Sequence, residues 1–279
     1  MMYLPAIFYQ ETINYLSSRR FILSLLLIFL PAICGIWFSN MMYHNPSIIA
    51  RMTGGWIVEV TPKICMMAYL DVAPLPIALT AIINASDFIA GEKQRGMLEL
   101  LVSKPLQRWE IVVGKYLSFS LVFLVLIFIK LNIFNLALKF LGIGLIENRV
   151  LLSYTVALVL TGIVYTSIST LLSTLMRGVL AAILAGFLIL IAWYVFDWMI
   201  LYLPLSTSNT LEKFSLFYYI DNIIGYMSSG KAALLLRGGV SPKVSVNFFL
   251  KSLMVILGIL SLLPIALSII ILQKKDTTR

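Results

Sequence analysis

The residues of this chain that could carry out chemistry are few and scattered. The only histidine, His44, has no second candidate ligand near it, whereas a zinc site needs three or four ligands. Cys34 and Cys65 are too few for a disulfide framework; a single bridge between them stays open, and two small apolar residues are the simpler interpretation. The sequence also lacks His-Glu-x-x-His, Gly-x-Ser-x-Gly and a catalytic cysteine–histidine pair. We therefore expect no metal site and no catalytic residue on this chain.

A nucleotide-binding loop is also missing from the sequence. In the P-loop pattern Gly-x-x-x-x-Gly-Lys-Ser/Thr, backbone amides hold phosphate groups. Gly114 and Lys115 approach this pattern, but Tyr116 follows them and Trp109 stands at the position of the upstream glycine. We therefore expect ATP, if the protein uses it, to bind another polypeptide.

Charged side chains of both signs are densest in residues 86–115. A polar helix end at 90–95 precedes Gly96, which permits a bend, and residues 97–102 read as a short apolar helix fringed with charge. Pro105 ends this helix, because the residue before a proline avoids helical geometry. Such a helix can lie flat and present a surface to a partner. A solvated loop with a lipid-facing stripe is the alternative, and composition alone does not decide between them.

The segments on either side of this loop must lie in a membrane. Hydrophobic residues make up 61% of the 279 positions and charged residues 12%, about half the charged fraction of a soluble chain. This composition, with a mean hydropathy of +0.99, excludes a soluble globule and a disordered chain. A hydrocarbon core of about 30 Å needs about 20 apolar residues as a helix. Six runs meet this length: 21–39, 64–86, 111–130 with a mixed continuation to 139, 151–176, 179–203 and 248–272. The sequence thus predicts an all-α integral membrane protein in which residues 1–279 form one transmembrane domain.

Basic residues indicate the orientation of these spans. Lysine and arginine collect before the first run, between the second and third, between the fourth and fifth, and after the sixth. By the positive-inside rule these segments face the cytoplasm, so both termini are expected in the cytoplasm. We expect the membrane to be the plasma membrane of a prokaryotic cell. The net charge of +9 then reflects contact with membrane lipid rather than with nucleic acid.

Residues 1–20 form a separate element before the first span. Several apolar residues fall near one helical face: Leu4, Ile7, Phe8, Tyr15 and Leu16. Polar residues fall elsewhere on the helix: Gln10, Glu11, Asn14 and Ser18. We interpret this segment as an amphipathic helix in the inner membrane interface, in preference to an unstructured lead-in.

The charged loop resembles that of a known family. Ten residues carry the pattern: Asp87, Glu92, Gly96, Leu98, Glu99, Leu101, Pro105, Glu110, Gly114 and Lys115. This arrangement resembles the loop of type-2 ABC export permeases, although Met97 stands where family members usually have threonine. The layout of six spans, the N-terminal helix, the aromatic stretch 217–220 and the Lys-Lys-Asp sequence at 274–276 are also similar to that family.

The resemblance implies a division of labour between subunits. It implies that residues 87–110 hold a coupling helix, which docks into a groove on an ATP-binding subunit. The residues matched to this contact are Glu92, Arg95, Gly96, Leu98, Glu99, Leu101 and Pro105. It also implies short re-entrant helices at the outer face within 204–247. The complex would hold two ATP-binding subunits, which bind ATP and magnesium, and a second permease chain, the same or related. This chain would move a substrate outward without being an enzyme itself.

Three ionisable residues lie at membrane depth, in the outer third of their spans: Asp71, Lys130 and Asp197. Charged groups inside a membrane are costly and are by default functional candidates. The simpler interpretation is that all three side chains extend to the outer surface. Pro74 and Pro76 would break or kink the second helix beside Asp71, which makes Asp71 the best candidate for a gate, with Lys130 as a partner.

Two other classes of membrane protein compete with a permease of this kind. A secondary carrier or channel acting without an ATPase would favour an internal repeat and charges near the midplane, and neither is evident. A membrane enzyme would need a catalytic set, which the sequence lacks.

Overall fold

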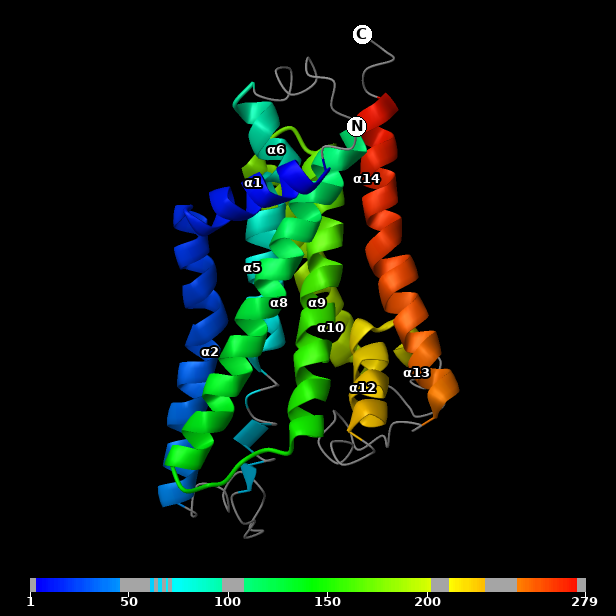
Figure 1. The fold of residues 1–279 in the computed structure, drawn as a ribbon. Helices are drawn as coiled ribbons and strands as arrows, with labels where there is room; N and C mark the ends of the chain where they lie inside the picture. Colours follow the sequence, from blue (N-terminus) through cyan, green and yellow to red (C-terminus); the bar gives the residue numbers. More distant parts are fainter. Residues whose placement is uncertain are drawn as a thin grey trace.

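The chain folds as a bundle of helices. A computed structural model describes residues 4–45, 72–96, 108–201, 211–228 and 245–274, together with positions 61, 62, 65, 66 and 69. Within these residues there are helices and no strand. The helices, labelled as in Figure 1, are α1 (Leu4–Leu16), α2 (Arg19–His44), α5 (Pro74–Ala85), α6 (Asp87–Gln94), α8 (Arg108–Phe140), α9 (Asn148–Leu175), α10 (Val179–Leu201), α12 (Leu216–Met227), α13 (Val246–Leu253) and α14 (Leu263–Lys274). A 3-10 turn, Glu212–Phe214, precedes α12, and a π-helical stretch, Met254–Leu262, joins α13 to α14.

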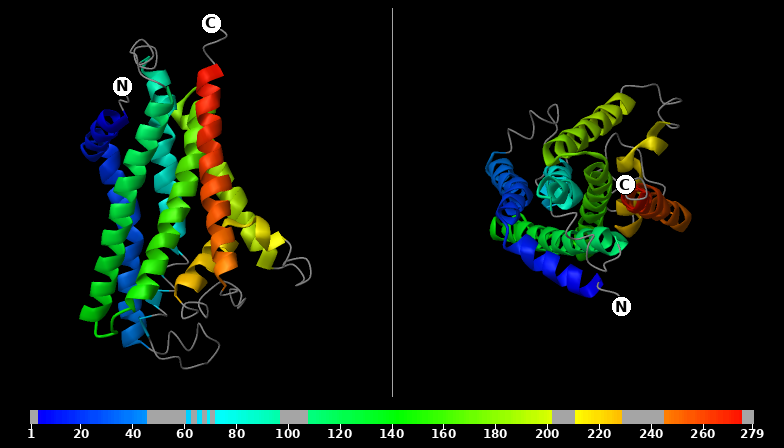
Figure 2. Two further views of the ribbon diagram at one scale, coloured as in Figure 1. Left: turned by 45° about the vertical axis from the view of Figure 1, so that its right-hand side comes forward. Right: turned by 90° about the horizontal axis from the view of Figure 1, so that it is seen from above.

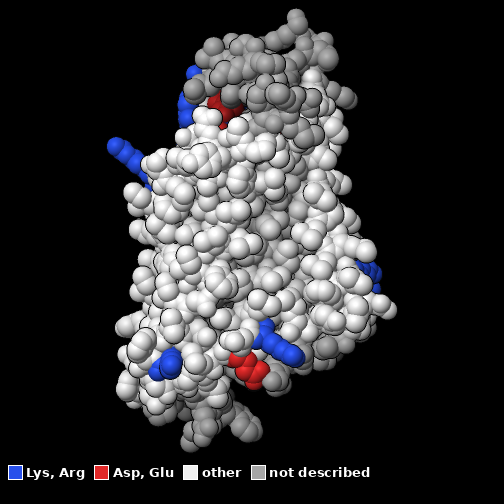
Figure 3. Space-filling model, viewed as in Figure 1, with Lys and Arg blue, Asp and Glu red and all other residues white. Residues whose placement is uncertain are grey.

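Six helical stretches are long and apolar enough to cross a membrane, as the sequence predicted. They are Arg19–His44, Pro74–Gln94, Trp109–Phe140, Asn148–Leu175, Val179–Ile200 and Val246–Gln273. They run roughly side by side, and the end of α14 lies at the same end of the bundle as α1 and α6 (Figure 1). The middle of the face shown in Figure 3 carries no charged residue, as expected of a surface in contact with lipid.

Helix α9 is the centre of the bundle. It packs against α5, α8, α10, α12 and α14, and the view down the bundle shows it surrounded by other helices (Figure 2). Its many buried hydroxyl groups are accommodated because several donate to carbonyl groups of the preceding turn, such as Thr161 to Ala157 and Thr166 to Gly162. A serine- and threonine-rich helix can therefore occupy the core without charged partners.

Helix α1 lies across one end of the bundle and packs on α8 (Figure 1). Four of the five residues assigned to its apolar face, Leu4, Ile7, Phe8 and Tyr15, are half-buried. The fifth, Leu16, is exposed, and Glu11, which was expected on another face, lies on the inward one. Residues spaced by four share one face of a helix. The face of α1 that buries Ile7 and Tyr15 therefore also carries Glu11, which points inward. The placement of α1 at the membrane interface stays a prediction.

The second and sixth spans each contain proline. Pro74 is the first residue of α5 and Pro76 lies in its first turn, where a missing N–H costs little. In the sixth span Pro264 lies in the first turn of α14, directly after the π-helical stretch, so this proline coincides with a change of helix type. Cys34, which is exposed, and Cys65, which is buried, are both free.

The described part of the segment between the fifth and sixth spans contains α12, which packs against α9 and α13. Ser215 caps its first turn by accepting a hydrogen bond from the backbone N–H of Phe217, and its hydroxyl donates to Asp197 of α10. This link joins α12 to the fifth span. Re-entry of this segment into the membrane from the outer face stays a prediction.

Candidate functional site

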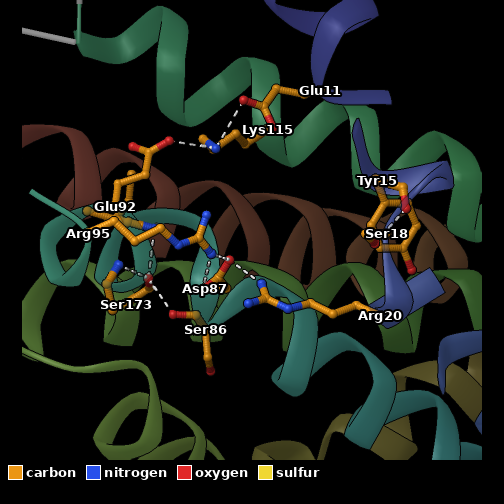
Figure 4. Close-up of polar contacts among 12 residues, drawn as sticks. Glu11, Tyr15, Ser18, Arg20, Ser86, Asp87, Glu92, Arg95, Lys115 and Ser173 are labelled. Carbon is orange, nitrogen blue, oxygen red and sulfur yellow. Dashed lines mark hydrogen bonds and ion pairs between the residues drawn. The ribbon is translucent and has the colours of Figure 1, made fainter. Parts of the chain in front are cut away.

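Helix α6 is the most polar part of the second span, and it lies where the charged loop begins. It follows α5 after a break at Ser86. Ile89 packs with Val112 of α8 and Ile265 of α14, whereas the charged residues of α6 meet partners from other helices. We call six charged residues the α6 cluster: Glu11, Arg20, Asp87, Glu92, Arg95 and Lys115. Figure 4 shows them converging around α6.

Asp87 forms the first ion-pair group of the α6 cluster. Its carboxylate pairs with Arg20 of α2 and, at 3.1 Å, with Arg95 at the end of α6. Gly91 stands one turn after Asp87, and a Cβ at this position would collide with the Asp87 carboxylate. The absence of a side chain at Gly91 therefore lets Asp87 face both arginines.

Lys115 forms the second ion-pair group and joins three helices. Its ammonium group lies 2.8 Å from Glu92 of α6 and 3.1 Å from Glu11 of α1. The Lys115 and Glu92 side chains are only 12% and 11% exposed. Next to it, Gly114 allows close approach of α1, because a Cβ there would lie 2.8 Å from Ile7. The two motif residues Gly114 and Lys115 thus hold α1 and α6 against α8.

Helix α9 binds α6 from the other side. The Ser173 hydroxyl accepts hydrogen bonds from the backbone N–H groups of Ile89 and Ala90 and donates to the carbonyl of Ser86. This single side chain therefore satisfies backbone groups left open by the break between α5 and α6. Lys93 donates to the carbonyl groups of Ser173 and Met176, where its positive charge complements the C-terminal end of α9.

A polar chain connects α1 to α2 and α5. The Tyr15 hydroxyl donates to Ser24 over 2.9 Å, and the Asn84 amide donates to the same hydroxyl over 2.8 Å. Burial raises the pKa of Tyr15 to about 12, and the hydrogen bond to Ser24 lowers it in part. Tyr15 therefore acts as a hydrogen-bond donor at physiological pH. Thr12 and Ser118, 2.8 Å apart, add a contact between α1 and α8.

The residues predicted for the coupling contact are divided by what the structure describes. Glu92 and Arg95 belong to the α6 cluster, and Gly96 adopts a φ of +68°, which favours glycine and agrees with a bend. The remaining four lie outside the described residues: Leu98, Glu99, Leu101 and Pro105. Their contact with an ATP-binding subunit therefore stays a prediction.

The residues predicted at membrane depth lie apart from the α6 cluster. Asp71 lies outside the described residues. Lys130 is completely buried, with its ammonium group 5.4 Å from the centre of the Tyr69 ring and no hydrogen-bond acceptor among the described residues. Asp197 is 8% exposed and accepts a hydrogen bond from Ser215. The interpretation that the side chains of Lys130 and Asp197 reach the surface is therefore wrong, because neighbouring helices cover both.

Sequence reasoning missed several partners in this site. Glu11, Arg20, Lys93 and Ser173 were not assigned to it, and Lys115 was noted only as part of the loop motif. A lysine inside an apolar run gave a usable signal for Lys115, since such a residue needs a partner. The pairing of Arg20 with Asp87 has no local signal, because it arises only when α2 packs against α5 and its first turn comes close to Asp87. Among the residues that the structure describes, no group of His, Cys, Asp and Glu could hold a metal ion.

The fold and the site define a multi-pass membrane protein. At the base of one loop, its charged helix α6 is joined to neighbouring helices by ion pairs and hydrogen bonds. The sequence model of the ABC-2 family transporter proteins matches residues 5–277, nearly the whole chain. The chain belongs to this family, whose members are membrane subunits of ABC transporters that work with an ATP-binding subunit and are not themselves the ATPase. The family does not favour a secondary carrier or channel. A comparison with curated proteins found no match.

Proposed function

We propose that this chain is the permease of an ATP-driven exporter, and that α6 passes the movement of the ATP-binding subunit to the membrane helices. Two ATP-binding subunits, each holding ATP and magnesium, would bind below two permease chains, identical or related. The end of the bundle that carries α1 and α6 would face the cytoplasm of a prokaryotic cell. Substrate would leave in the outward direction.

The observation that carries this proposal is the set of links around α6. Ion pairs join α6 to α2 through Asp87 and to α8 and α1 through Glu92 and Lys115. Hydrogen bonds from Lys93 and to Ser173 join it to α9. A displacement of the loop that follows Gly96 would therefore act on four helices together. A loop held only by its peptide bonds would not do so.

Removing the apolar face of the loop tests the partner contact. Leu98→Asp combined with Leu101→Asp places charge on the surface that we assign to the ATP-binding subunit. A co-expressed ATP-binding subunit should then be lost from the detergent-solubilised complex, while the permease stays inserted in the membrane. Leu145→Asp is the control, because Leu145 is an exposed leucine in the loop between α8 and α9, at the other end of α8. Recovery of the ATP-binding subunit at the wild-type level in the double variant would refute the assignment.

Orientation is tested separately in intact cells. Tags at the two termini should be protected from a membrane-impermeant reagent, and a tag at Thr207 should react. A C-terminal tag that reacts in intact cells would refute the proposed orientation, whatever the result for the loop.

Lys130, Asp197 and Asp71 are our candidates for the transport pathway or its gate. The complete burial of Lys130 and the link from Asp197 to α12 support roles inside the bundle. If they act in transport, Lys130→Gln and Asp71→Asn should each change substrate-stimulated ATPase activity, with a double variant that is less than additive. Near-normal transport in both single variants would remove them as candidates.

A further inference from the structure

A polar cavity of about 560 Å³ lies at the end of the bundle that carries α1 and α6. Residues of α1, α2, α5, α6 and α8 line it, and its volume falls in the usual range of about 300–1,000 Å³ for small-molecule sites. Three arginines and one lysine give its lining four basic side chains, against the three carboxylates of Glu11, Asp87 and Glu92. The lining therefore carries one surplus positive charge, which favours an anionic ligand.

Two of the arginines that line the cavity are held next to each other. One oxygen of Asp87, Oδ2, pairs with Nη1 of Arg20 in α2 and with Nη2 of Arg95 at the end of α6. Two nitrogen atoms that bind one oxygen lie within about 6 Å of each other. Figure 4 shows both arginine side chains pointing toward Asp87. At this separation a single phosphate group can accept hydrogen bonds from both guanidinium groups, because its oxygens are strong acceptors that point in different directions.

A ligand in the cavity can reach both of these arginines. The side chain of Arg20 is 41% exposed and that of Arg95 is 55% exposed. Asp87 engages a single terminal nitrogen of each guanidinium group, and the other nitrogens have no partner among the described residues. A guanidinium group carries several N–H donors in a planar fork that matches the geometry of phosphate oxygens. Arg20 and Arg95 can therefore bind a phosphate while they remain paired with Asp87.

An exposed apolar face of α2 leads away from the cavity along the bundle. Arg19 lines the cavity at the start of this helix, is exposed, and has no ion pair with any residue that the structure describes. Exposed large side chains follow it every three or four residues, on the same helical face: Ile22, Leu26, Leu30, Ile33 and Trp37. The stretch from Ile22 to Ile33 corresponds to about 16 Å, about half of a hydrocarbon core of about 30 Å. This face therefore suits the acyl chain of a lipid whose headgroup lies at the arginines, and a free phosphate would not use it.

We propose that this cavity binds the phosphate of an anionic phospholipid, whose acyl chains lie on the exposed face of α2. The phosphate accepts hydrogen bonds from Arg20 and Arg95, and Arg19 adds positive charge at the edge. Basic pockets between membrane helices bind anionic headgroups in this way. The lipid would join two helices, because Arg20 lies in α2 and Arg95 at the end of α6. Its binding depends neither on export nor on an ATP-binding subunit.

Lipids that share acyl chains but differ in headgroup test this proposal. Phosphatidylglycerol and phosphatidylcholine are titrated onto the purified full-length protein in detergent, and their dissociation constants are measured by native mass spectrometry. Phosphatidylglycerol should bind about tenfold more tightly, because no choline cation offsets the charge of its phosphate. Equal affinities, or tighter binding of phosphatidylcholine, would overturn the proposal. Inorganic phosphate at the lipid concentration should leave phosphatidylglycerol bound; displacement of the lipid would overturn its assignment as the ligand and indicate a site for free phosphate.

Variants then assign the headgroup preference to the cavity. Arg95→Gln removes one exposed guanidinium group and leaves Asp87 paired with Arg20. It should weaken phosphatidylglycerol binding by about tenfold, the loss expected for one charge-assisted hydrogen bond, and leave phosphatidylcholine binding unchanged. Arg149→Gln is the control, because Arg149 is an exposed arginine near the start of α9, and this variant should bind both lipids as the wild type does. Unchanged phosphatidylglycerol binding in Arg95→Gln, or an equal loss in the control, would overturn the proposal.

A second variant keeps the proposal testable if Arg95→Gln fails to fold. Arg19→Gln breaks no ion pair among the described residues, so it should leave the stability of the lipid-free protein unchanged. It should reduce the preference for phosphatidylglycerol over phosphatidylcholine by about threefold, as expected for the loss of one exposed charge interaction. A preference equal to that of the wild type would overturn the proposal.

Discussion

Replacing Lys115 by glutamine removes a cation that pairs with both Glu92 and Glu11. Its pairs with both carboxylates are short, and the Lys115–Glu92 pair is nearly closed to solvent, with side chains 12% and 11% exposed. Removing one member of a buried pair leaves an uncompensated charge and costs about 3–5 kcal/mol. Because some solvent reaches both groups, we expect Lys115→Gln to lower the free energy of unfolding by about 3 kcal/mol.

The two carboxylate partners of Lys115 should contribute unequally. Glu11 is 28% exposed, so solvent screens its charge and Glu11→Gln should cost less than about 1 kcal/mol. Glu92→Gln together with Lys115→Gln leaves no buried charge unpaired between these two positions. The double variant should therefore lose less than the sum of the single losses, with an interaction energy of at least about 1 kcal/mol.

Equilibrium unfolding of the purified protein in mixed micelles, followed by tryptophan fluorescence, measures these differences. Lys139→Gln is the matched control, because Lys139 is an exposed lysine at the other end of the same helix. A loss in Lys115→Gln no larger than that of the control, with strict additivity in the double variant, would show that water reaches the pair freely. In that case α6 would not be tied to α8 by charge.

Three further perturbations follow from the packing and can be measured by the same unfolding experiment. Gly114→Ala should destabilise the protein and increase proteolysis of α1, because the new Cβ meets an α1 side chain. Gly258→Ala is the control, since a Cβ at Gly258 meets nothing within 4 Å, and equal effects of the two variants would contradict the close approach of α1. Lys130→Met should leave stability unchanged or raise it, since it removes a buried charge with no acceptor among the described residues; a loss above about 1 kcal/mol would reveal an acceptor. Ser215→Ala should cost about 1–2 kcal/mol, because it removes both the cap of α12 and the hydrogen bond to Asp197; an unchanged stability would show that the cap is dispensable.

The spans could be predicted from the sequence because a membrane imposes a local requirement, about 20 apolar residues in a row. The mixed stretch that follows Lys130 was harder to interpret, since polar side chains interrupt it. The structure continues α8 through this stretch to Phe140. Asn132 donates to the carbonyl of Phe128, and Asn135 accepts from the backbone N–H of Ile146. Local and short-range partners thus allow a polar sequence to remain helical at this depth.

The site was less accessible to sequence reasoning because its pairs are not local. The motif pattern singled out Glu92 and Lys115, but it did not indicate that these two residues contact each other. Glu11 was assigned to the wrong face because sorting the residues around a helix by polarity places every carboxylate on the outward face. The structure places Glu11 inward because Lys115 supplies a partner there, and no rule based on residues 1–20 alone contains that information.

The length of α8 has a mechanical consequence. The helix runs from Arg108 to Phe140 without a proline, which corresponds to about 50 Å. Phe123, near its midpoint, lies against Gly162 of α9 so closely that any Cβ at Gly162 would collide with the ring. If α8 tilted as a rigid rod about this contact, a tilt of about 5° would move its two ends by about 2 Å in opposite directions. The two ends of α8 would then move out of phase, one toward its neighbours as the other moves away, on opposite sides of the membrane.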